Sequence, residues 1–131
     1  MKREHIVFVK NFLRAYSQPI SEREIENKIR LIEKNMIYLW QIPIENKALF
    51  LEGDEAKQAF DCLNKKGALE FFFDGPFSNE YPLPLKRTNN NSLAIELNDL
   101  EEFYVFDKNY KWCYVVTHEK DECGPFFFRT A

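Results

Sequence analysis

Apolar residues recur at helical spacing near the start of the chain, which predicts two helices there. The first covers residues 6–16 and ends before Pro19, because proline cannot continue a helix. Ser21 with Glu24 three residues later fits a capping box at the start of the second helix. The apolar stripe that follows predicts that this helix extends to about Ile37.

A third helix is predicted after a short irregular stretch. Pro43 disfavours a helical conformation at the preceding residue, Ile42. We therefore expect residues 38–44 to be extended and packed on the core. The next helix is predicted from Asp54, which can cap it, to about residue 65, with Gly67 just beyond its end. Its expected inner face consists of Ala56, Ala59, Phe60 and Leu63.

The pattern changes from helices to strands after residue 67. Short aromatic or β-branched runs predict strands at 68–74, 92–98 and 125–130 and a hairpin over 102–118. A loop rich in Pro and Asn separates the first two. This order predicts one α+β domain over residues 1–131. Its N-terminal helices would pack on one face of a mostly antiparallel sheet of about four to five strands.

Two triplets of phenylalanine, at 71–73 and 126–128, place aromatic rings on both faces of the predicted sheet. Neighbouring strand residues point to opposite faces, so a triplet needs cover on both. We expect Phe71, Phe73, Phe126 and Phe128 to face the helices. The opposite face would be covered by loop 75–91 folded back, or by a partner protein.

Composition indicates a globular protein that does not span a membrane. No apolar run approaches the ~20 residues that a membrane-spanning helix needs. Lys10 and Arg14 interrupt the apolar part of the N-terminus, so no secretory signal is expected and we expect a cytoplasmic location. Cys62, Cys113 and Cys123 are too scattered for a disulfide framework, and reduced thiols are expected.

Charge is unevenly distributed, and this bears on the kind of partner. Residues 1–66 hold 12 basic and 10 acidic side chains, a net of +2, whereas residues 67–131 hold 6 and 11, a net of −5. No basic stripe is present, so a nucleic-acid partner is not expected. The acidic half favours a basic protein partner, unless these acids only solvate the surface. The contact residues expected from this pattern are Tyr81, Glu96, Asp99, Glu101, Glu102 and Tyr104.

Residues 113–123 contain the side chains most suited to chemistry, but their spacing is poor. Cys113 and His118 are five apart on a predicted strand and would face opposite ways, and neither a CxxC nor an HExxH motif is present. We therefore expect no metal, no cofactor and no enzymatic activity, with His118 neither ligand nor catalyst. The alternative is a small hydrolase or metal-dependent enzyme that uses His118, Glu119 and Cys123. His5, near the N-terminus, is expected to contact solvent.

The C-terminal stretch 103–129 resembles a family of small uncharacterised bacterial proteins. The matching positions are Asp107, Trp112, Tyr114, Val115, Thr117, His118, Glu119, Gly124, Pro125 and Phe126. This resemblance implies no activity. More loosely, helices followed by an aromatic hairpin look like SMI1/KNR4-like immunity proteins, which neutralise bacterial toxins. The resemblance and the charge pattern together favour a non-enzymatic protein-binding module, most concretely an immunity protein; a structural domain is a further alternative.

Overall fold

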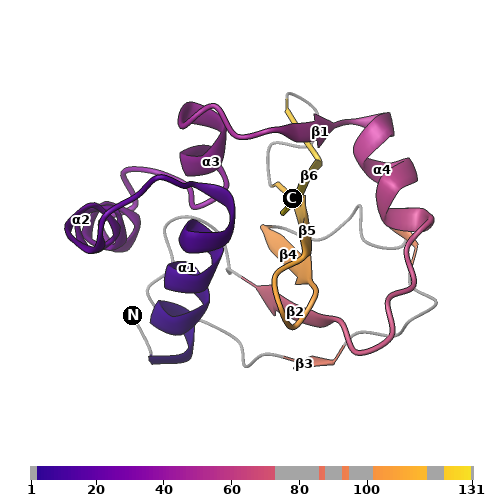
Figure 1. Cartoon of the computed structure of the whole chain (residues 1–131), viewed down its shortest axis with the longest axis horizontal. Helices are drawn as coiled ribbons and strands as arrows, with labels where there is room; N and C mark the ends of the chain where they lie inside the picture. Colours follow the sequence, from indigo (N-terminus) through magenta and orange to yellow (C-terminus); the bar gives the residue numbers. More distant parts are fainter. Residues whose placement is uncertain (1–2, 73–85, 88–92, 95–101, 118–122, 131) are drawn as a thin grey trace.

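The fold combines helices with one antiparallel sheet (Figure 1). The computed structural model describes residues 3–72, 86–87, 93–94, 102–117 and 123–130. The helices found there are α1 (Arg3–Tyr16), α2 (Glu22–Glu33), α3 (Gln41–Glu45) and α4 (Asp54–Asp61). The strands are β1 (Phe50–Glu52), β2 (Leu69–Phe72), β3 (Lys86–Arg87), β4 (Phe103–Phe106), β5 (Trp112–Val116) and β6 (Phe126–Arg129). None of the helices in these ranges has the length and apolar character that crossing a membrane requires.

The first two helices form where the sequence predicts them. The buried face of α1 carries Phe8, Val9, Phe12, Leu13 and Tyr16. At the start of α2 the capping box is complete: the Glu24 N–H donates to Ser21 Oγ at 3.1 Å, and the Ser21 N–H donates to Glu24 Oε1 at 3.3 Å. This helix ends at Glu33, earlier than expected, and Met36 beyond it is 66% exposed.

The stretch 38–44 is not extended, which corrects the expectation from Pro43. Gln41–Glu45 forms the short helix α3, with Pro43 as its third residue. A proline in the first helical turn lacks only an N–H that would have no partner within the helix. The apolar residues Leu39, Trp40 and Ile42 are buried, so the segment does pack on the core as expected.

All strand pairs of the sheet are antiparallel, and the order is β1-β6-β5-β4-β2-β3. The hairpin of β4 and β5 and the last strand β6 confirm the expected strands. The short edge strands β1 and β3 are not expected from the sequence. In the segment 92–98, predicted as a strand, the structure describes Leu93 and Ala94, and Ala94 is helical and buried.

Helices cover the sheet on both faces, as Figure 1 shows with the sheet seen nearly edge-on. The α+β class is confirmed, and α1, α2 and α3 share a core with one face. Phe8 of α1, for example, packs on Phe106 with ring centroids 4.7 Å apart. The opposite face is covered by α4, whose Ala56 and Phe60 are fully buried there together with Ala94. The expected inner face of this helix is confirmed, although its N-cap is Gly53 and it ends at Asp61.

The second phenylalanine triplet divides between the two faces. Phe126 and Phe128 lie in the core shared with α1, α2 and α3, as expected, and Phe127 lies in the core under α4. Of the first triplet, the structure describes only the backbone of Phe71 and Phe72, which pair with Tyr104 and Phe103. Phe73 and most of loop 75–91 lie outside the described residues; the described part of that loop, Lys86–Arg87, forms β3.

Candidate partner-binding site

Two of the contact residues expected from the sequence are inside the protein. Glu102 is 3% exposed and Tyr104 is fully buried, so neither presents its side chain to a partner. Tyr104 lies in the core shared with α1 and donates a hydrogen bond to Glu102, and the local acidic pattern does not reveal this position. The other four expected contacts, Tyr81, Glu96, Asp99 and Glu101, lie outside the described residues.

The buried carboxyl of Glu102 accepts a hydrogen bond in the core. The Tyr104 hydroxyl donates to Glu102 Oε2 at 3.1 Å. The Trp40 indole N–H makes no hydrogen bond among the described residues, but it favours the charged form of the same carboxyl. Burial raises the pKa of Glu102 to about 7, and the Tyr104 and Trp40 groups oppose a larger rise. The Glu102 carboxyl is therefore a titrating group inside the protein and not a surface contact.

The residues of the enzymatic alternative do not form a described catalytic arrangement. His118 and Glu119 lie outside the described residues, and Cys123 is half-buried. The carbonyl of Cys123 accepts a hydrogen bond from Thr117 Oγ1 at 2.9 Å. No group of three or more His, Cys, Asp or Glu side chains in the described ranges is placed to hold a metal ion. His5, expected to contact solvent, is fully buried on α1.

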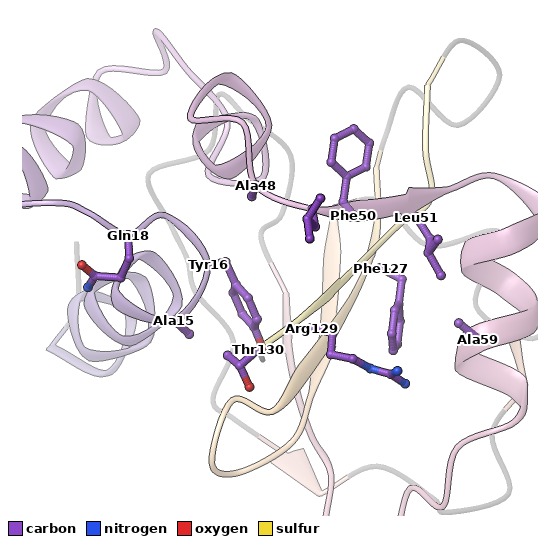
Figure 2. Close-up of a pocket in the computed structure, with 11 residues that line it drawn as sticks. Ala15, Tyr16, Gln18, Ala48, Phe50, Leu51, Ala59, Phe127, Arg129 and Thr130 are labelled. Atoms are coloured by element: carbon purple, nitrogen blue, oxygen red, sulfur yellow. The ribbon is translucent and has the colours of Figure 1, made fainter.

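An open groove lies beside the β1 edge of the sheet, with a volume of about 700 Å³ (Figure 2). One wall comes from the end of α1, through Ala15, Tyr16 and Gln18, and residues 48–51 form another. Ala59 of α4 closes the far side. The floor is made by Phe127, Arg129 and Thr130. The groove thus lies where three segments distant in sequence meet.

Three consecutive apolar side chains are exposed along this groove. Leu49 is 91% exposed, Phe50 36% and Leu51 37%. Phe50 and Leu51 belong to β1, which is an edge strand of the sheet and, among the described strands, pairs with β6 alone. An apolar edge strand of this kind is typical of a surface that pairs with another chain. The sequence signal is the run at 48–51, which falls outside every predicted element.

Arg129 is the only cationic side chain among the described residues that line the groove. Its guanidinium lies 5.6 Å from the centre of the Phe127 ring, and Figure 2 shows the side chain directed toward Ala59. Among the described residues, no carboxylate forms an ion pair with Arg129. The Tyr16 hydroxyl is already used, since it donates to the Tyr110 carbonyl at 2.8 Å. The described lining is therefore mostly apolar and carries one positive charge.

A family model described as "Domain of unknown function (DUF4275)" matches residues 5–127. The chain belongs to the DUF4275 family. Membership of an uncharacterised family is thus confirmed, and the match reaches from α1 to β6 of the DUF4275 fold, well beyond the C-terminal third. No curated protein and no solved structure matches the chain. Within the groove, Arg129 and Thr130 lie just past the DUF4275 match.

Proposed function

We propose that this DUF4275 protein is a non-enzymatic protein-binding domain, and more specifically an immunity protein that neutralises a toxin domain. The observation that supports binding is the exposed apolar run at 49–51 beside a groove at the sheet edge. Burying these side chains against a partner would remove apolar surface from water, at roughly 25 cal/mol per Å². Contiguous exposed apolar surface of this kind marks interaction sites in soluble proteins.

A protein partner suits this surface better than a small metabolite. The groove is open along a strand edge, and the polar side chains among its described lining residues come from two segments, Tyr16 and Gln18 from the end of α1 and beyond it, and Arg129 and Thr130 from the end of β6 and beyond it. Small-molecule sites usually enclose most of the ligand and converge several polar groups on it. An extended surface with an apolar centre and a single charge fits the contact region of a protein complex.

The immunity role is the finer part of the proposal and is supported by the layout of helices and aromatic hairpin. A basic toxin domain would be attracted by the net charge of −5 in residues 67–131. Glu96, Asp99 and Glu101 stay as proposed contacts for its charges, whereas the buried Glu102 and Tyr104 leave that set. The groove supplies the apolar part of the interface.

Site-specific crosslinking tests the binding proposal. A photoreactive residue at Leu49, inside the proposed interface, is compared with one at Met36, which is also exposed and does not line the groove. In lysate of the native host, position 49 should capture one defined protein and position 36 should not. Equal capture at both positions, or none at position 49, contradicts the binding proposal.

Co-expression then tests the immunity role separately. The gene of the captured protein is expressed alone and together with the parent protein or the Leu49→Asp variant. Toxicity that the parent suppresses and the variant does not supports neutralisation. A captured protein that is harmless when expressed alone leaves a binding domain and rejects the immunity role.

A further inference from the structure

The backbone of β6 has one residue inside the groove, Arg129, that is not opposite a residue of β1. β1 pairs with β6 over three residues, from Phe50 opposite Phe128 to Glu52 opposite Phe126. The Gly53 N–H donates to the Pro125 carbonyl at 2.9 Å, so the backbone groups of Pro125 face β1. In an antiparallel ladder these directions alternate along the strand.

The alternation directs the backbone of Arg129 into the groove. On the other side of β6, the Thr130 N–H donates to the Lys111 carbonyl at 3.0 Å, toward the end of β5. The backbone N–H and C=O groups of the even-numbered β6 residues therefore point toward β5. Those of Arg129 point toward the line of β1. At this point β1 has ended, because its first residue is Phe50, opposite Phe128.

The groove occupies the place that a longer β1 would fill. Instead of continuing along β6, the chain at Ala48 and Leu49 leads back to α3. The opening is bounded by Ala15 on one side and Ala59 on the other, two small side chains that leave room for a backbone (Figure 2). An extended segment can lie there and continue the line of β1.

The lining determines which side chains such a segment should carry. Leu51 presents apolar surface, and Arg129 presents a guanidinium without an ion-pair partner among the described residues. A guanidinium in an apolar setting favours a carboxylate, which it can bind with two parallel hydrogen bonds. Side chains of an extended segment alternate in direction, so an acid can face Arg129 while its neighbours contact apolar walls.

We infer that the groove binds an extended segment of the partner, with an acidic group flanked by apolar residues, as an added strand on β6 anchored at Arg129. This inference rests on the proposed function, since it describes how the partner protein is held. Strand addition of this kind takes its affinity from backbone hydrogen bonds and its specificity from alternate side chains. Arg129 supplies both: a backbone donor and acceptor, and a charge.

Peptide selection tests the inference with the purified protein. Ten-residue random peptides displayed on phage are selected against the parent protein, and enriched sequences are synthesised for fluorescence-polarisation titrations. We expect enriched peptides with one acidic residue, or a free C-terminal carboxylate, between apolar residues. Arg129→Gln should weaken their binding about tenfold, and Lys108→Gln, an exposed cation in the hairpin turn, should not.

The backbone part of the inference has its own measurement. N-methylation is scanned along the best peptide, one amide at a time. Because Arg129 alone offers a carbonyl to the groove, loss of binding at one amide, with the neighbouring amides tolerated, is expected. Selection of no peptide, equal binding to parent and Arg129→Gln, or uniform tolerance of N-methylation would overturn the inference.

The peptide experiments and the crosslinking experiment can fail independently of each other. A partner captured at position 49 together with peptides indifferent to Arg129 keeps the protein-binding function and rejects strand addition at β6. Acidic peptides that depend on Arg129, without any captured partner, support the groove chemistry and reject the proposed function in that host.

Discussion

Replacing Phe60 by alanine tests whether α4 holds the second face of the sheet. The Phe60 side chain is fully buried. Its ring stacks on Tyr114 with centroids 4.3 Å apart and lies 6.0 Å from the Trp112 ring. The ammonium of Lys65 lies over the Phe60 ring, 4.6 Å from its centre. One residue therefore joins the helix to two residues of β5.

The expected loss of stability follows from this burial. Truncating a core phenylalanine to alanine costs about 3–5 kcal/mol through lost transfer energy and the cavity that remains. The lost stacking on Tyr114 favours the upper part of this range, and the better helix propensity of alanine returns roughly 0.5 kcal/mol. We expect a loss of about 4 kcal/mol in the free energy of unfolding. For a domain of 131 residues this corresponds to a Tm lower by about 10–20 °C.

Urea denaturation with two probes measures the loss. Circular dichroism follows the whole chain, and tryptophan emission separates the two faces, because Trp112 lies under α4 and Trp40 lies in the core with α1. A Trp40→Phe background leaves Trp112 as the single reporter beside Phe60. Phe50→Ala is the matched control: its ring is 36% exposed at the sheet edge and its loss should cost about half as much.

A small effect would refute the packing argument. If Phe60→Ala lowers the free energy of unfolding by less than about 1 kcal/mol, the ring is not in a closed core. Unchanged Trp112 emission in the folded variant would likewise show that α4 does not lie against this face.

Three further substitutions give expected changes in the free energy of unfolding, each measured by urea titration. Glu102→Gln should abolish a pH dependence: the folded pKa of about 7 exceeds the usual value of 4.5, so the contribution of Glu102 to stability is complete below pH 4.5 and about 2–3 kcal/mol of it is lost between pH 5 and 8. Gly124→Ala should cost more than Gly67→Ala. Both have positive φ, +84° and +78°, but a Cβ at Gly124 would lie 3.1 Å from Thr117 Oγ1, whereas none of the described atoms lies within 4 Å of one at Gly67. Ser21→Ala should cost about 1 kcal/mol, because it removes the cap of α2.

Each has an outcome that contradicts it. A Glu102→Gln variant that keeps the parent's decline between pH 5 and 8 assigns that decline to another group. Equal costs for Gly124→Ala and Gly67→Ala mean that Thr117 moves away freely. For Ser21, the control is Ser21→Asp, which keeps a capping oxygen; if it is as unstable as Ser21→Ala, the cap is not the cause.

Local signals predict the elements that carry their own start and stop residues. The capping box at Ser21 fixes the start of α2, and alternating aromatic residues around Asp107 fix the hairpin of β4 and β5. The phenylalanine triplet at 126–128 correctly indicates a sheet covered on both faces. The second face is covered by α4 and not only by the loop or partner protein expected from the sequence. An amphipathic pattern shows which side of α4 is buried, but not against which face of a sheet.

The missed features depend on partners distant in the sequence. β1 has three residues, too few for a recognisable alternation, and exists because β6 lies beside it. Glu102 is acidic and lies among other acids, so the local pattern indicates a surface, yet its position two residues before Tyr104 on the same side places it in the core. The groove cannot be predicted at all from local pattern, since its walls come from α1, α4 and β6.

The position of β6 between β1 and β5 also bears on how the chain folds during synthesis. Phe50 pairs with Phe128, 78 positions later, and Tyr16 donates to the carbonyl of Tyr110, 94 positions later. Contacts of such long range make folding slow, because the connecting chain must lose much of its freedom first. On the ribosome, the N-terminal helices have no sheet to pack on until the hairpin emerges, and β1 has no neighbour until β6 follows. Until β6 emerges, the segment at 49–51 therefore also lacks the strand that partly covers Phe50 and Leu51 in the folded protein, and a chaperone can bind it in that interval.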